Sequence, residues 1–208
     1  MGLSIIAGNM TLARGVSWSC IMPFPLIRPI LAAWLILSVM PVAAVEAEIC
    51  FDYSCRRQQT AVFADHELAE LRTLLDTAAD AEQERALIGE AIGRMYAIAA
   101  RQTPIWRDRG RNFMDQRDLA GAMDCIDHST NTERFLHLLA DAGAIKFHQP
   151  GERRVRFRFL LLGEHWTATL IENQGDAGYA VDAWFFDPGL AAAVVPFERW
   201  RAGYDPES

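Results

Sequence analysis

Apolar residues recur at helical spacing over two segments in the first half of the chain. The first covers residues 66–78, and Asp65 directly before it is a residue type that caps helices. The second covers residues 81–101, with Asp80 in the capping position and Pro104 just beyond its end. We predict two amphipathic helices whose apolar faces lie in the core.

The next stretch, residues 105–124, has no apolar period and is predicted to be a loop anchored by Trp106, Phe113 and Met114. A third helix follows and ends near Gly143, but two starts are possible. A capping box at residues 130–133 would start it at Asn131. Asp124 could instead cap a helix that begins at Cys125.

Beyond Gly143 the pattern changes to alternation, which is typical of half-buried strands. Residues 154–161 form the first expected strand, with its apolar members (Val155, Phe157, Phe159 and Leu161) on one face. Four arginines cluster in and beside this strand: Arg153, Arg154, Arg156 and Arg158. They form either a solvated face of the strand or a local contact for an anion.

Two further strands, residues 165–172 and 179–186, flank the glycine-rich turn 173–178 and should pair as an antiparallel hairpin. The fold class is therefore α+β, because helices come first and strands follow.

The first 47 residues are expected to be a targeting segment rather than part of the folded domain. Residues 30–45 carry no charge, Arg28 precedes them, and Val45-Glu46-Ala47 offers small residues for a signal peptidase acting before Glu48. The apolar run is about 16 residues, shorter than the roughly 20 of a membrane span. We expect residues 1–47 to be a signal peptide or membrane anchor, with translation starting at Met1 or Met22, and residues 48–208 to be a single domain.

Composition and charge narrow the class of protein. The chain has 208 residues, 51% of them hydrophobic, and a formal charge of −7. It is therefore globular, and it is not expected to bind nucleic acid. Membrane contact is expected only through the N-terminal segment, if that segment remains uncleaved. The same segment implies that the domain after it is periplasmic or extracellular.

Four cysteines fit an oxidising compartment. Cys20 belongs to the leader, and Cys50 and Cys55 are close enough in sequence to form a short disulfide loop. Cys125 is left unpaired, and an unpaired cysteine in an exported protein needs a reason. Metal binding is not expected, because His128 and Cys125 would form only half of a site.

Cys125, His165 and Asp182 are candidates for one catalytic site. Cys125 lies at a possible helix start, His165 opens a strand, and Asp182 lies in the strand that should pair with it. Folding about the centre of the six-residue turn sets Asp182 opposite Thr169, about 13 Å along the strand from His165. Contact between the two side chains therefore requires a bulge or a slip of the register.

Residues 121–189 resemble the core of the transglutaminase-like family of the papain-like cysteine enzymes. The resemblance rests on Cys125 at a helix start, Leu138-Leu139-Ala140-Asp141-Ala142-Gly143 at the helix end, His165-Trp166 opening a strand, and Val181-Asp182-Ala183-Trp184 in the next strand. This family commonly has His-Ala-Trp and Val-Asp-Pro at the last two positions. The resemblance implies a nucleophile-bearing helix packed on a small antiparallel sheet.

The resemblance also implies the roles: Cys125 as nucleophile, His165 as base and Asp182 as orienter, with no cofactor. A helix N-terminus and a nearby imidazolium are expected to lower the pKa of the thiol. The expected function is thiol-dependent acyl transfer on a peptide, protein or cell-wall amide. The alternative is an inactive domain of the same fold that binds a protein or peptide.

Overall fold

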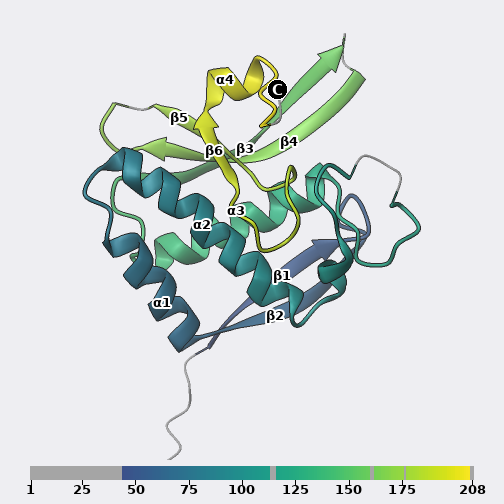
Figure 1. Cartoon of the computed structure of the whole chain (residues 1–208), viewed down its shortest axis with the longest axis horizontal. Helices are drawn as coiled ribbons and strands as arrows, with labels where there is room; N and C mark the ends of the chain where they lie inside the picture. The colour runs from purple at the N-terminus through teal and green to yellow at the C-terminus, as the bar shows by residue number, and fades with distance from the viewer. Residues whose placement is uncertain (1–43, 113–115, 160–161, 176, 207–208) are drawn as a thin grey trace, which may run out of the picture. The chain divides into compact units, whose positions relative to one another are not determined.

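A computed structural model describes residues 44–112, 116–159, 162–175 and 177–206, and these form a mixed α+β fold (Figure 1). The α+β prediction is therefore confirmed. In chain order the elements are β1 (Ala44–Phe51), β2 (Arg57–Ala64), α1 (Asp65–Asp76), α2 (Ala81–Ala100), the 3-10 helix η1 (Pro104–Arg107), α3 (Cys125–Asp141), β3 (His148–Phe159), β4 (Leu162–Glu172), β5 (Gly178–Asp182), β6 (Ala193–Pro196) and α4 (Phe197–Arg201).

The predicted helices are present, with one correction at a cap. Asp80 caps α2 as expected, because its side chain accepts a hydrogen bond from the backbone N–H of Gln83. Asp65 is the first residue of α1 rather than its cap, and Glu67 reaches back to the backbone N–H of Ala64. The start of α3 is Cys125, so the alternative with Asp124 as cap is the right one.

The predicted hairpin belongs to a four-stranded antiparallel sheet of order β3-β4-β5-β6. Its register differs from the expectation by two residues, since Ala168 pairs with Val181. The loop is shorter than six residues, because the backbone N–H of Glu172 still donates to the carbonyl of Ala177. Continued by one residue, this register sets Asp182 opposite Thr167 and thus closer to His165.

The face assigned to the first predicted strand was wrong at residues 156 and 157, whereas Arg154 is exposed and Val155 is half-buried, as predicted. Phe157 is 47% exposed, whereas Arg156 is only 6% exposed. The guanidinium of Arg156 lies 4.6 Å from the centre of the Trp200 ring and donates to the backbone carbonyls of Trp200 and Tyr204. A buried arginine is tolerated because these contacts replace water. Arg156 is therefore neither on a solvated face nor a free contact for an anion.

The hairpin of β1 and β2 was not predicted, because its first strand overlaps the expected leader. The two strands pair along their whole length, from Ala44 with Ala64 to Phe51 with Arg57. Cleavage before Glu48 would remove half of β1. The expected leader otherwise lies outside the described residues, and among the residues that are described no helix is long and apolar enough to cross a membrane.

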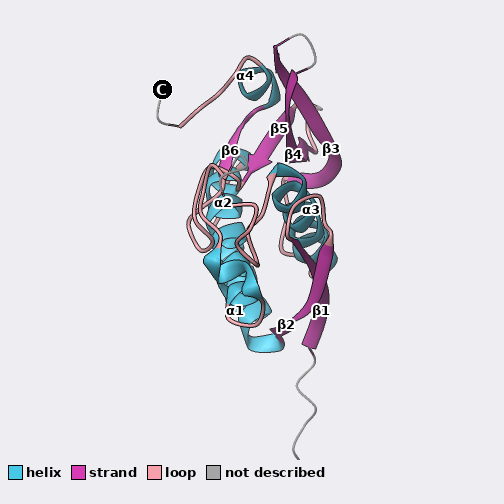
Figure 2. Ribbon diagram, turned by 90° about the vertical axis from the view of Figure 1, so that its right-hand side faces the viewer, coloured by secondary structure: helices cyan, strands magenta, loops and turns pink. Residues whose placement is uncertain are grey.

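Helix α3 is central to the domain, because it contacts β1 on one side and β3, β4 and β5 on the other. Figure 2 shows the hairpin of β1 and β2 beside α3, with α1 and α2 forming a separate pair of helices. Side chains of α2, α3, β4 and β5 share one core cluster. The opposite side of β5 packs against α4, through Ala180, Val195 and Trp200.

Candidate functional site

Cys125 is the first residue of α3, and the N-terminus of that helix is fully capped. The Asp124 side chain accepts hydrogen bonds from the backbone N–H groups of Ile126 and Asp127, at 3.0 and 2.9 Å. Asp127 in turn accepts from the backbone N–H of Asp124 at 3.2 Å. This reciprocal pair is a capping box. It fixes the backbone that carries the Cys125 side chain.

A turn between β1 and β2 holds the same helix end from outside. The four residues Asp52, Tyr53, Ser54 and Cys55 all have φ between 55° and 63°, which makes one turn of left-handed helix. Its N–H groups point at the helix cap: Ser54 donates to Asp124 at 2.9 Å and Cys55 donates to Asp127 at 2.6 Å.

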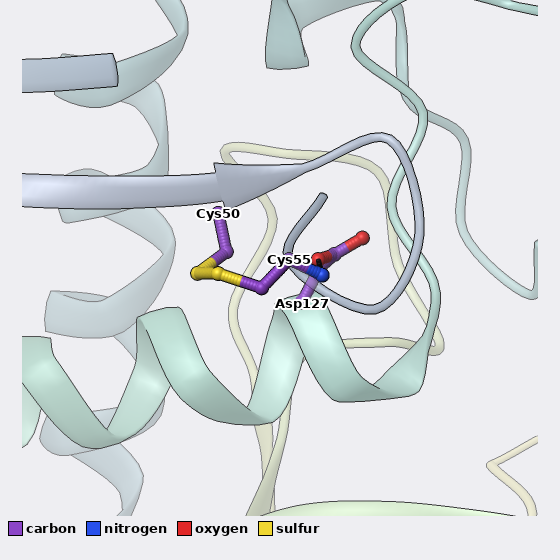
Figure 3. A group of neighbouring side chains, drawn as sticks. All are labelled: Cys50, Cys55 and Asp127. Atoms are coloured by element: carbon purple, nitrogen blue, oxygen red, sulfur yellow. Dashed lines mark hydrogen bonds between the residues drawn. A yellow bond between two sulfur atoms is a disulfide. The ribbon is translucent and has the colours of Figure 1, made fainter. Parts of the chain in front are cut away.

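The predicted disulfide between Cys50 and Cys55 is confirmed, and it closes this turn (Figure 3). Cys125 is a free cysteine, as expected. The sulfur atoms of the disulfide and the Asp127 carboxylate lie within 4.8 Å of one another. This geometry could suit a metal, but both sulfur atoms are already bonded to each other.

Asp127 is a buried carboxyl with an altered affinity for protons. Burial and the charge of Asp124 raise its pKa from 3.8 to about 7, against the lowering effect of the N–H groups of Cys55 and Asp124. The cap of α3 therefore takes up a proton near neutral pH.

The structure brings His165 and Asp182 together. His165 Nε2 lies 2.7 Å from Asp182 Oδ2, and both residues are buried. The shift of the β4–β5 register explains the contact, because residues that are diagonal neighbours on adjacent strands lie within reach of long side chains. The bulge or slip that the sequence required is this shift.

Asp182 accepts hydrogen bonds from three donors. His165 Nε2 and Trp200 Nε1 both donate to Oδ2 at 2.7 Å, and the backbone N–H of Trp184 donates to Oδ1 at 3.2 Å. Since Nε2 of His165 carries the proton in this network, Nδ1 of the neutral imidazole is the basic nitrogen.

Aromatic rings surround the imidazole of His165. The ring centres of Trp184, Phe185 and Trp200 lie 4.7, 5.7 and 5.7 Å from it. These contacts fix the orientation of the imidazole and exclude water from its bond to Asp182. Sequence analysis missed Trp200. A buried tryptophan needs an acceptor and a buried aspartate needs donors, and this complementarity was the available signal.

Cys125 and His165 line one cavity of about 230 Å³. The Cys125 sulfur lies against the backbone of β4 on both sides of His165. It is 3.9 Å from the carbonyl oxygen of Glu164, and it receives a hydrogen bond from the backbone N–H of Trp166. The three residues predicted from the sequence thus lie in one region, with Cys125 and His165 on the cavity wall and Asp182 behind the imidazole, and the Cys125 thiol donates to the Glu164 carbonyl.

The protonation of Cys125 differs from the expectation. Burial raises the pKa of the thiol to about 12, and the charges of Asp124, Asp182 and Glu164 act in the same direction. The hydrogen bond from the Trp166 N–H lowers the pKa of the thiol, but its effect is smaller than that of burial. Cys125 is therefore a neutral thiol at rest, and the expected lowering of its pKa was wrong.

An ion pair forms another part of the cavity wall. Arg111 Nη1 and Nη2 donate to the two carboxylate oxygens of Asp205 at 3.0 and 2.6 Å, and both residues line the cavity. Arg111 comes from the long loop before α3, and Asp205 follows α4. Neither was singled out from the sequence, because the two are 94 residues apart.

The loop that carries Arg111 is anchored by polar groups rather than by Trp106, which is 57% exposed. Asp108 accepts from His128 Nε2 at 2.9 Å and from the backbone N–H of Met123 at 2.7 Å. Asn112 accepts from the hydroxyl of Tyr53. The other two expected anchors, residues 113 and 114, lie outside the described residues. His128 therefore forms a buried pair with Asp108.

Comparison of the chain with protein-family models, with curated proteins and with solved structures found no match.

Proposed function

We propose that this chain is a thiol-dependent acyl-transfer enzyme that acts on an amide bond, with a papain-like arrangement of its helix and sheet. The observation that carries the proposal is the 2.7 Å contact of His165 Nε2 with Asp182, in a cavity that His165 shares with Cys125. Nucleophile, base and orienter are the groups that this chemistry needs. The resemblance in sequence supports the same assignment.

The proposed reaction has two steps. The Cys125 sulfur attacks the carbonyl carbon of the amide, and its proton passes to Nδ1 of His165. The imidazolium then gives this proton to the leaving nitrogen, and the C–N bond breaks to leave a thioester. Water, or an amine, attacks the thioester and restores the thiol. Asp182 stabilises the imidazolium between the two proton transfers.

The raised pKa of Cys125 specifies how the first step begins. A neutral thiol at rest means that His165 removes the proton as the sulfur attacks, rather than from a thiolate–imidazolium pair formed beforehand. The N–H of Trp166 and the N-terminus of α3 favour the thiolate as it develops.

Trapping the thioester tests the proposal. We would incubate the chain with a synthetic peptide mixture, with and without hydroxylamine, and analyse the products by mass spectrometry. Hydroxylamine is a strong nucleophile, so peptides that acylate Cys125 should appear as hydroxamates in addition to acids. Cys125→Ala and His165→Ala should each abolish both products, because residues that act as one unit have non-additive effects.

His137→Ala is the matched control for His165→Ala, because His137 is an exposed histidine on α3. It should leave both products unchanged. Products that persist in Cys125→Ala, or their absence from the unmodified chain over the whole mixture, would contradict the proposal.

One observation favours a second candidate function, a non-catalytic domain that binds a peptide or protein. A thiol with a pKa of about 12 is a poor nucleophile unless a base assists it. If the cavity only binds, peptides from the same mixture should be retained unmodified and equally by the chain and by Cys125→Ala. Covalent products that depend on Cys125 favour the enzyme.

We also propose that the domain works outside the cytoplasm. The confirmed disulfide supports an oxidising compartment, because cytoplasmic thiols are kept reduced. The uncharged segment of residues 30–45 supplies the means of export.

A further inference from the structure

We propose that Arg111 is a carboxylate-binding subsite of the cavity, and that Asp205 occupies it at rest in place of an acidic group of the substrate. The proposal rests on the proposed function and adds a substrate class to it. The substrate would be an amide whose acyl residue, or the residue beside it, carries a carboxylate.

The geometry of the ion pair is that of ligand recognition. Arg111 engages Asp205 with two nitrogens on two oxygens, the planar arrangement by which arginine selects carboxylates. The pair is not deeply buried: the Arg111 side chain is 27% exposed and the Asp205 side chain 22% exposed. Both groups are reached by water, so an entering carboxylate can approach the guanidinium. A carboxylate that makes the same two hydrogen bonds would replace Asp205 without loss of charge pairing.

Arg111 is held in position independently of Asp205. Its φ is 62°, a left-handed conformation that non-glycine residues rarely adopt. Its backbone N–H donates to the carbonyl of Trp184 at 2.8 Å, and its guanidinium lies 5.5 Å from the centre of the Phe185 ring. Strained backbone of this sort is concentrated at ligand-binding positions. Trp184 and Phe185, which pack against His165, thus also hold Arg111 in place.

Asp205 lies in the half-buried tail that follows α4, directly after Tyr204, whose ring packs against Phe185. Residues 201–203 are exposed, and Gly203 adopts a φ of 104°, which turns the chain back after α4. The tail is tied to the domain at Tyr204, whose carbonyl accepts from Arg156 at 3.1 Å. The Asp205 side chain can therefore be displaced while Trp200 stays on Asp182. An entering carboxylate would restore the charge balance that Asp205 provides.

The size of the cavity limits how far the carboxylate can be from the reacting carbonyl. Its volume of about 230 Å³ lies below the roughly 300–1,000 Å³ of pockets for small molecules. Cys125, His165 and Arg111 all line this space, so one or two residues of a substrate fill it. An aspartate, a glutamate or a free α-carboxylate next to the scissile amide meets this requirement.

Two alkylating reagents of nearly equal size test the subsite on the full chain. Iodoacetate and iodoacetamide differ only in that the first carries a carboxylate and the second an amide. The measured quantity is the ratio of their rates at Cys125, with the alkylated peptide identified by mass spectrometry. The variants are Asp205→Asn, Asp205→Ala, Arg111→Gln and the double variant Asp205→Asn/Arg111→Gln. Asp118→Asn and Arg201→Gln are matched controls at exposed positions.

Removing the charge of Asp205 should raise the iodoacetate-to-iodoacetamide ratio about tenfold, the effect of one charge-assisted hydrogen bond. Arg111→Gln should abolish that gain in the double variant, and the controls should keep the original ratio. Asp205→Ala provides the same reading if Asp205→Asn folds poorly.

An unchanged ratio in both Asp205 variants, with normal iodoacetamide labelling, overturns this proposal and leaves the proposed function standing. A gain that persists without Arg111 also overturns it, since any loss of negative charge would then suffice. A Cys125 that neither reagent labels contradicts both proposals. Labelling that follows the expected ratios, in a chain that forms no thioester, overturns the acyl-transfer function and the amide substrate, and leaves Arg111 as a subsite for a carboxylate.

Discussion

The identity of residue 182 as an aspartate is determined by the three hydrogen-bond donors around its buried carboxylate. Oδ2 serves the nitrogens of His165 and Trp200, and Oδ1 serves the backbone N–H of Trp184. All three neighbours donate, so both oxygens must accept. A buried donor that loses its acceptor costs about 1–3 kcal/mol. The triad therefore depends on α4, which supplies Trp200, as well as on the hairpin.

This arrangement predicts the effect of Asp182→Asn. In either orientation the amide NH2 faces a donor: Trp184 N–H in one, and His165 with Trp200 in the other. We expect a loss of about 1–3 kcal/mol in the free energy of unfolding and a fall in turnover of several orders of magnitude, because the tautomer of His165 is disturbed.

Denaturant unfolding and turnover on a trapped peptide would measure the two effects. Asp141→Asn is the matched control, because Asp141 is exposed at the end of α3. Full activity in Asp182→Asn would show that His165 needs no orienter.

Asp127 makes the stability of the domain depend on pH. Its pKa is raised from 3.8 to about 7, mainly by burial and by the charge of Asp124. Between these two values the folded chain holds a proton that the unfolded chain releases. The contribution of Asp127 to stability is therefore greatest at low pH and is lost as the pH rises from about 4 to about 7.

We expect the free energy of unfolding to be smaller at pH 7.5 than at pH 5.5, in the part that depends on Asp127, so that the domain is less stable at the higher pH. Asp127→Asn should flatten this slope, since the amide oxygen can still accept from Cys55 without titrating. Asp118→Asn, at an exposed position, should keep the slope. Equal slopes in all three chains, measured by urea unfolding, would contradict the assignment.

At the scale of the elements, the left-handed turn between β1 and β2 is stable only where it is docked. Four non-glycine residues in that conformation cost about 1–2 kcal/mol each. Closing a loop of this length with a disulfide contributes only about 2 kcal/mol. The remainder comes from contacts with the rest of the domain, among them the hydrogen bonds of Ser54 and Cys55 to the cap of α3 and those of Asp52 to Gly121 and Ala122. The turn and the helix end therefore stabilise each other.

Removing the disulfide should consequently disturb the nucleophile-bearing helix. We expect Cys50→Ser/Cys55→Ser to lose about 2 kcal/mol or more of stability. Hydrogen–deuterium exchange should become faster in the first turn of α3, because its cap loses two external donors. Dithiothreitol should reproduce this in the unmodified chain and have no further effect on the double variant. Unchanged exchange at Ile126 and Asp127 would show that the turn holds without its disulfide.

Local signals predicted some elements well, and their limits have physical reasons. Asp80 and Pro104 mark the ends of α2 because capping and proline geometry act within a few residues. The two-residue shift of the β4–β5 register depends on how the turn closes, which the glycine-rich sequence permits but does not dictate. Period-two alternation at Arg156 and Phe157 was right, but the buried face depends on Trp200, which is distant in sequence.

The same distinction holds for the site. Cys125, His165 and Asp182 were recognised as candidates because their residue types and order carry information. Trp200 was missed because it reaches Asp182 through β6 and α4. Arg111 and Asp205 were missed because they reach the cavity from the loop before α3 and from the tail after α4. Residues 190–196 show no apolar period, so the strand and helix that place Trp200 had no signal of their own.

For the whole molecule, the strand β1 bears on where the exported chain should begin. The predicted cleavage point before Glu48 lies inside β1, which pairs with β2 from Ala44 onward. N-terminal sequencing of protein from the periplasm or medium should give a start between Ala44 and Glu48. A chain that starts at Ala44 should melt at a higher temperature than one that starts at Glu48, since it keeps Ala47 buried. Full-length protein in the cytosol alone would contradict export.

The place of Asp205, three residues from Ser208, has a practical consequence for handling the protein. A tag or fused protein joined directly after Ser208 would lie three residues beyond Asp205, which is paired with Arg111. A histidine tag there would bring its own charge and bulk to the tail, and assays on such material would report a perturbed cavity. Because β1 begins at Ala44, a tag inserted between the leader and that residue leaves the tail as it is.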